Sequence, residues 1–209
     1  MAEVRLDVEQ LIARAGFEKL DGIIGKALAL YKSKHIPLNH ILAEVLIAHY
    51  LYNVKKYECV DIERSVNGMR CDVYGRTNGR VHCIEVEYLF TPPSYILSPF
   101  EYVVARHIKK LVLAAKAGID FVSFAYPKYV VPPIPLELLR PPASRSIEEI
   151  KRIVSTVRSI VPLDYDDVEK LIGMPIHSIL FFDLSTGKVY ECIPQVVEVM
   201  VTQYEAFFV

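Results

Sequence analysis

Apolar residues recur every three to four positions in several stretches of the chain, a spacing that places them on one face of a helix. Gly16 and Gly118 follow two of these stretches, where glycine commonly ends a helix. Ser146 begins a Ser-x-x-Glu capping box, which is typical of a helix start. The pattern predicts helices over residues 6–15, 21–31, 39–48, 100–117 and 147–159, and a short acidic helix over 164–172.

Alternation of side chains with a period of two predicts three successive strands, over residues 57–66, 70–77 and 80–87. Asn67-Gly68 and Asn78-Gly79 separate them, and Asn-Gly favours a tight turn because both residues accept a positive φ. A two-residue turn at Asn78-Gly79 places Thr77 opposite Arg80 and, further along, Asp72 opposite Glu85. We therefore expect three antiparallel strands.

The remaining pattern predicts a mixed α/β chain. The apolar run over 121–126 suits a buried strand, and frequent proline over 129–142 indicates an extended connector. Residues 175–183 and 188–193 should form a second hairpin, followed by an apolar tail over 196–209 whose type the pattern does not define. We divide the chain into an N-terminal helical segment (1–36), a core (37–142) and a C-terminal helix-and-hairpin extension (143–209) that is a candidate for dimerisation.

Composition narrows the functional classes. The 209 residues are 52% hydrophobic, enough for a sizeable core, and the stretches of apolar residues are too short to span a membrane. The charged N-terminus does not resemble a signal peptide, so we expect a soluble, cytoplasmic protein. A net charge of −1 gives no overall attraction for nucleic acid, so any DNA affinity must arise from local basic patches. Scarce Asn and Gln suggest a thermophilic source.

The four cysteines have no CxxC spacing, which argues against a zinc or redox motif. In the predicted register Cys71 and Cys83 point to opposite faces of the sheet, so we expect no disulfide between them. A bond from either one to Cys59 or Cys192 remains open, since hyperthermophiles keep intracellular disulfides.

Facing carboxylates on the central hairpin are the clearest candidates for chemistry. Asp72, Glu85 and Glu87 share one face by the period of two, and like charges at such positions repel unless a cation lies between them. Oxygen ligands suit a hard cation such as Mg²⁺ or Mn²⁺. The alternative is an acidic, solvent-facing hairpin in which Arg70, opposite Glu87, forms an ordinary cross-strand pair.

The helix over 39–48 carries one carboxylate among its apolar residues. Glu44 lies one turn after His40, and a carboxylate beside a buried stripe usually has a partner. That partner is either His40 or a metal ion. His49, by contrast, is expected to be a core or boundary histidine.

A helical Glu44, a strand with Asp72, a turn and a strand with Glu85 together resemble the PD-(D/E)XK nuclease superfamily, most closely the archaeal Holliday-junction-resolvase type. The resemblance covers about residues 38–127 and implies a restriction-endonuclease-like mixed sheet flanked by helices. It also implies a metal held by Asp72, Glu85, the Val86 carbonyl and Glu44. Glu87 departs from the pattern, because the family usually has lysine there, and the basic helix over 100–117 can supply a cation instead.

These expectations lead to a Mg²⁺- or Mn²⁺-dependent DNA endonuclease, acting on branched or structured DNA as a homodimer. Asp72, Glu85, Glu44 and Glu87 would form its catalytic centre. The basic side chains expected to contact DNA are Arg76, Arg80, Arg106, Lys109 and Lys110. Two alternatives remain open: a non-catalytic DNA-binding or assembly protein on the same fold, and a helix-turn-helix regulator that uses the first two helices.

Overall fold

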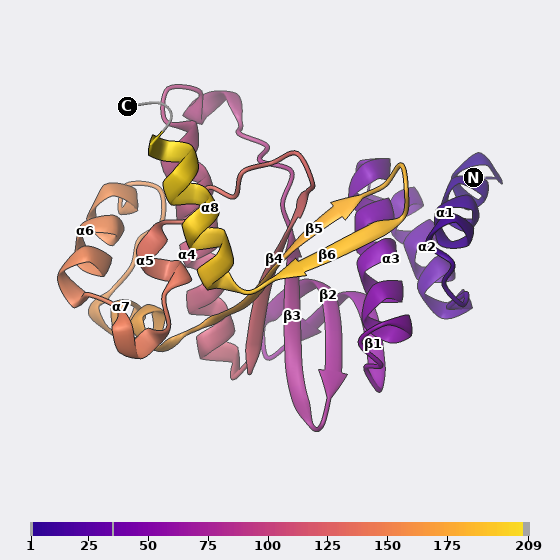
Figure 1. Ribbon diagram of the computed structural model, residues 1–209, viewed down its shortest axis with the longest axis horizontal. Coiled ribbons are helices and arrows are strands. Elements are labelled where there is room, and N and C mark those ends of the chain that lie inside the picture. The colour runs from indigo at the N-terminus through magenta and orange to yellow at the C-terminus, as the bar shows by residue number, and fades with distance from the viewer. Residues whose placement is uncertain (1, 35, 207–209) are drawn as a thin grey trace.

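Six strands form one mixed sheet in the order β1-β2-β3-β4-β5-β6 (Figure 1). The computed structural model describes residues 2–34 and 36–206. Strands β1 to β3 are antiparallel, β3, β4 and β5 run parallel, and β6 returns antiparallel to β5. Their bounds are β1 Cys59–Val66, β2 Met69–Thr77, β3 Arg80–Val86, β4 Phe121–Pro127, β5 Ile176–Asp183 and β6 Lys188–Cys192. The expected mixed sheet of an α/β protein is confirmed.

Helices cover both faces of the sheet (Figure 1). Helix α3 (Leu38–Asn53) packs on one face, with α1 (Ala2–Ala15) and α2 (Asp21–Lys34) against it. The other face carries the remaining helices and two 3-10 turns, which are α4 (Pro99–Ala117), α5 (Leu136–Leu139), α6 (Ile147–Val157), α7 (Tyr165–Gly173), α8 (Pro194–Ala206), η1 (Pro93–Tyr95) and η2 (Pro142–Ser144). The sheet therefore separates an α3-side core from an α4-side core.

The first two helices belong to the α3-side core. Val8 and Ile12 of α1 are fully buried, as is Ala27 of α2, and they pack in one cluster with Ile41 of α3. This packing favours a helical cap over a DNA-reading helix-turn-helix. No helix within residues 2–34 and 36–206 has the length and apolar character needed to cross a membrane.

Both predicted Asn-Gly turns form with positive φ, at 46° and 87° for Asn67 and Gly68 and at 50° and 73° for Asn78 and Gly79. Thr77 pairs with Arg80, and the predicted register of the central hairpin holds as far as the last pair of the ladder, Val73 with Ile84. The prediction of three antiparallel strands is confirmed.

The predicted C-terminal hairpin forms as β5 and β6, and β5 pairs with β4. The segment after residue 143 therefore extends the same sheet rather than forming a separate one. The acidic helix is α7, whose Asp164 and Asp167 form a capping box. The apolar tail is helical as α8 up to residue 206, and residues 207–209 lie outside the described part of the chain.

Two histidines are fully buried as neutral rings. His82 bonds Tyr57 through Nδ1 at 2.9 Å and Ser123 through Nε2 at 2.8 Å, while His107 Nε2 lies 2.9 Å from the Tyr126 hydroxyl. Burial lowers the pKa of His82 and of His107 to about 3, because a charged ring would lose its hydration. His49 is likewise a core residue, as predicted, and accepts the Leu20 N–H at 3.0 Å.

These two rings each make an acid-sensitive contribution to stability. Below their ordinary pKa of about 6.5 the unfolded chain protonates both rings and the folded chain does not, so the contribution of each ring to the free energy of unfolding falls as pH drops from 6.5 towards 3. Each histidine should cost about 1.4 kcal/mol per pH unit in that window. Urea unfolding of the wild type and of His107→Gln at pH 7 and pH 5 measures how the free energy of unfolding changes with pH. The substitution should remove the contribution of one histidine from this change. An unchanged slope in the variant would contradict the assignment.

Candidate metal centre

The four carboxylates predicted from the sequence lie where the carboxyl end of β3 runs beside the first half of β2, between α3 and α4. Glu85 lies near the carboxyl end of β3, Glu87 directly follows that strand, and Asp72 and Glu44 come from β2 and α3. Glu44 is 0% exposed and Glu85 and Glu87 are each 1% exposed. The charge of Asp72 acts on all three, which identifies them as one electrostatic cluster.

Asp72 occupies the point at which the β2–β3 ladder stops. Backbone pairing ends at Val73 with Ile84, and beyond this pair Asp72 Oδ2 accepts the Val86 N–H at 2.8 Å. The side chain thus takes a bond that a strand backbone would otherwise take. This bond fixes the position of the Asp72 carboxylate.

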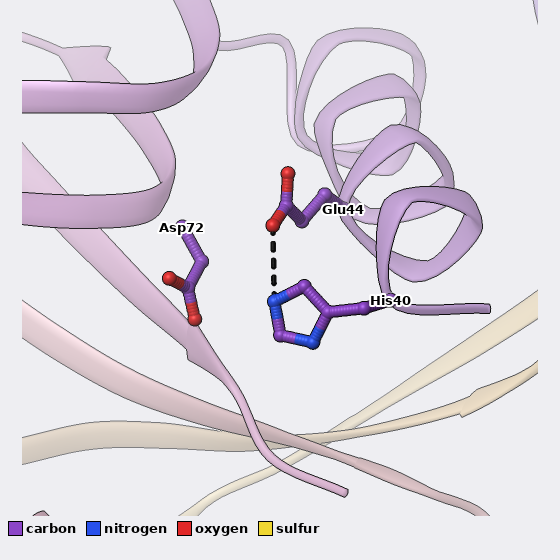
Figure 2. A group of neighbouring side chains, drawn as sticks. All are labelled: His40, Glu44 and Asp72. Atoms are coloured by element: carbon purple, nitrogen blue, oxygen red, sulfur yellow. Dashed lines mark ion pairs between the residues drawn. The ribbon is translucent and has the colours of Figure 1, made fainter. Parts of the chain in front are cut away.

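Helix α3 contributes a histidine and a carboxylate to the centre. His40 Nε2 lies 3.0 Å from Glu44 Oε1, one turn away on the helix. Glu44 Oε2 is buried and has no hydrogen-bond partner among residues 2–34 and 36–206. One ligand atom each from His40, Glu44 and Asp72 lie within 4.8 Å of one another (Figure 2).

His40 is a candidate ligand that the sequence pattern assigns only as a partner for Glu44. The spacing of four residues on a helix places both side chains on one face. What the spacing does not reveal is that Asp72 approaches the same pair from the sheet (Figure 2).

Helix α4 supplies cations to the other two carboxylates. Lys110 Nζ forms an ion pair with Glu85 Oε2, and Arg106 lies 3.0 Å from Glu87 Oε2 and 3.2 Å from Oε1. The Arg70–Glu87 cross-strand pair of the alternative, solvent-facing hairpin is therefore wrong, because Arg70 binds Glu63 at 2.7 Å instead. The prediction that the basic helix offers a cation near the motif agrees with this geometry.

Burial makes these carboxylates hard to ionise. Loss of hydration raises the pKa of Glu44 and of Glu87 to about 7 and that of Glu85 well above its usual range. Asp72 raises all three further, whereas His40, Arg106 and Lys110 oppose the shifts. For Lys110 burial alone would lower the pKa, but Glu85 and Asp72 raise it above the ordinary value.

Two sequence predictions about the hairpin faces are wrong. Glu85 and Glu87 contact α4, whereas Asp72 approaches the α3 residues His40 and Glu44, so the three carboxylates do not share one face. Cys71 and Cys83, expected on opposite faces, form a disulfide. Both errors have one physical cause, which is that β2 does not keep a regular pleat around Asp72. Cys59 and Cys192 are free, so neither takes part in a disulfide.

The candidate DNA-contacting residues fall into two groups. Arg106 and Lys110 lie in the centre, and Lys109 is exposed on the same helix. Arg76 and Arg80 lie at the opposite end of the hairpin, where Arg80 covers the Phe121 ring at 5.5 Å. Arg80 and Glu87 are separated by about 20 Å of extended strand.

No protein-family model, curated protein or solved structure matches this chain. The chemistry of the centre therefore rests on its own geometry.

The geometry predicts that Asp72 destabilises the protein when no metal is bound. Asp72→Asn removes the charge that opposes ionisation of three carboxylates, and its side-chain oxygen can still accept the Val86 N–H. We expect a gain of about 1 kcal/mol in the free energy of unfolding, measured by urea denaturation in EDTA at pH 8.

Asp61→Asn is the matched control. Asp61 also accepts a backbone N–H, from Ile62 at 2.9 Å, but it has a lysine partner, Lys26, at 2.8 Å. Loss of that charge should leave stability unchanged or lower it. Equal effects of the two substitutions on the free energy of unfolding would contradict the prediction that Asp72 repels the buried carboxylates.

Proposed function

We propose that the protein is a divalent-metal-dependent DNA endonuclease whose centre combines Glu44, Asp72, Glu85 and Glu87 with Lys110. The observation that carries the proposal is the buried Glu44 carboxylate, which has an oxygen without a hydrogen-bond partner and faces Asp72 and His40. A buried carboxylate of this kind costs free energy unless a cation or proton compensates it. Buried ionisable groups with such an unfavourable environment are common at functional sites.

The donor set fits a divalent cation. Asp72 and Glu44 offer oxygens and His40 offers an imidazole nitrogen. The family resemblance implies Glu85 and the Val86 carbonyl as further ligands. Carboxylates suit Mg²⁺ or Mn²⁺, and the imidazole favours Mn²⁺ of the two. A cation bound there would lower the pKa of a water molecule and stabilise charge on a scissile phosphate.

The chain's own residues supply the remaining functions. The Lys110 ammonium stands beside Glu85, where it can bind a phosphate oxygen in place of the lysine that the family carries at position 87. Arg106, which forms an ion pair with Glu87, can bind the same phosphate through two N–H donors of its guanidinium group. Glu87, with its pKa raised by burial, is suited to accept and release a proton near neutral pH.

Substrate and assembly are proposed from the family resemblance. We propose branched or structured DNA as substrate and a homodimer as the active form, because two copies of the centre would serve two strands. The overall net charge of −1 means that binding depends on local cations such as Arg106, Lys109 and Lys110.

The ion pairs of α4 favour a second candidate. Lys110 and Arg106 neutralise Glu85 and Glu87 without any added ion, which also suits a non-catalytic DNA-binding or assembly protein. The two functions differ in whether metal and Asp72 are required.

Cleavage assays test the proposal. Labelled four-way junction, flap, single-stranded and linear duplex DNA, with an RNA duplex alongside, are incubated with Mg²⁺, Mn²⁺ or EDTA. We expect metal-dependent cleavage that Asp72→Ala and Glu85→Ala abolish. Lys110→Met should lower the rate about 100-fold by removing a phosphate-binding charge.

Lys109→Met serves as the control for the lysine. It removes the same charge from the neighbouring, exposed position on α4 and should reduce cleavage far less. Absence of cleavage with every metal, together with DNA binding that survives Asp72→Ala, would reject the endonuclease and support the binding protein.

A further inference from the structure

A disulfide joins the two strands that supply the centre. Cys71 of β2 and Cys83 of β3 are bonded, with Cα atoms 5.3 Å apart, and both are fully buried in the α4-side core. Cys71 directly precedes Asp72, and Cys83 lies two residues before Glu85. Any change in this bond therefore acts next to two of the candidate ligands.

A regular hairpin would keep these cysteines apart. Continued pairing would place Cys71 on the face of Val73, because residues two apart in a strand point the same way. Val73 packs in the α3-side core, yet Cys71 packs in the α4-side core with Tyr74 and Cys83. Strand β2 thus changes face once between Val73 and Cys71, and the residue at that change is Asp72.

The neighbouring strand β1 also changes face, at Glu63, beside Asp72 of β2. Ile62 packs in the α3-side core, whereas Arg64 lies over the Tyr74 ring at 4.3 Å. Between them Glu63 has a φ of 48°, a left-handed conformation that interrupts the pleat. The β1–β2 ladder pairs residues on either side of Glu63 and Asp72 but omits these two.

The change of face decides what Asp72 can reach. In the observed arrangement its carboxylate caps the Val86 N–H and lies within 4.8 Å of ligand atoms of His40 and Glu44. In a regular pleat Asp72 would point towards α4, and the β2 backbone would take the Val86 N–H. Of the observed arrangement and this regular pleat, only the observed one assembles the three-residue group of Figure 2.

We propose that the Cys71–Cys83 disulfide is a positioning element. It holds β2 in the switched arrangement, in which the strand changes face between Val73 and Cys71, and so keeps Asp72 within reach of His40 and Glu44. The bond selects this arrangement because it can exist only while Cys71 faces α4. Its consequence for metal binding rests on the proposed function, whereas the placement of Asp72 does not.

Amide hydrogen exchange of Val86, followed by NMR, tests the placement without any metal. With the disulfide intact, Asp72→Ala removes the acceptor of the Val86 N–H and should speed its exchange at least tenfold. In a Cys71→Ala/Cys83→Ala background the backbone takes that bond, so adding Asp72→Ala should change the exchange rate less than threefold. An equal effect in both backgrounds would overturn the proposal, because a merely structural disulfide leaves the role of Asp72 unchanged.

Titration with Mn²⁺ alone gives the functional consequence. The dissociation constant should rise at least tenfold in Cys71→Ala/Cys83→Ala and stay within twofold in Cys59→Ala/Cys192→Ala, which removes only the free thiols. If the wild type does not bind Mn²⁺, the metal-centre proposal fails while the exchange comparison still decides the placement of Asp72. If the alanine pair does not fold, Cys71→Ser/Cys83→Ser replaces it, and failure of both pairs would assign the bond to folding and overturn the proposal.

Discussion

Burial of negative charge between α3 and α4 is the constraint on which this end of the molecule depends. Glu44, Glu85 and Glu87 are almost entirely removed from water, and a buried carboxylate without a partner costs several kcal/mol. Compensation comes from both helices, as Lys110 and Arg106 on α4 and His40 on α3. The two helices that cover opposite faces of the sheet are thus joined through one polar cluster.

The parallel part of the sheet places this cluster. Strand β3 leads through α4 into β4, a crossover that brings the helix back over the strand it follows. The Glu87 N–H bonds the Ala125 carbonyl at 2.8 Å, so the acidic end of β3 is held in register with β4. Fully buried Phe124 and Tyr126 of β4 then anchor the sheet in the α4-side core. A rigid apolar support of this kind keeps repelling side chains close together.

The irregularity of β1 and β2 at Glu63 and Asp72 is best understood together with the charge cluster. A regular strand would have paired its backbone and pointed Asp72 at Glu85, which would place two buried carboxylates side by side. The switched strand instead gives Asp72 a backbone donor and a place beside His40. The disulfide lies in the α4-side core, next to this irregular part of β2.

The sequence by itself determined the elements and much of the centre. Asn-Gly turns can adopt positive φ at low cost, so Asn78-Gly79 set the hairpin and its register, and a mixed sheet followed from the helix and strand pattern. The hairpin register predicted Asp72, Glu85 and Glu87 as neighbouring carboxylates, and the family resemblance added Glu44 to them. Only the tertiary structure decided which partners they have. Lys110, Arg106 and His40 lie on helices whose orientation against the sheet depends on long-range packing, and the disulfide depends on a change of face at Asp72 that no period of two reveals.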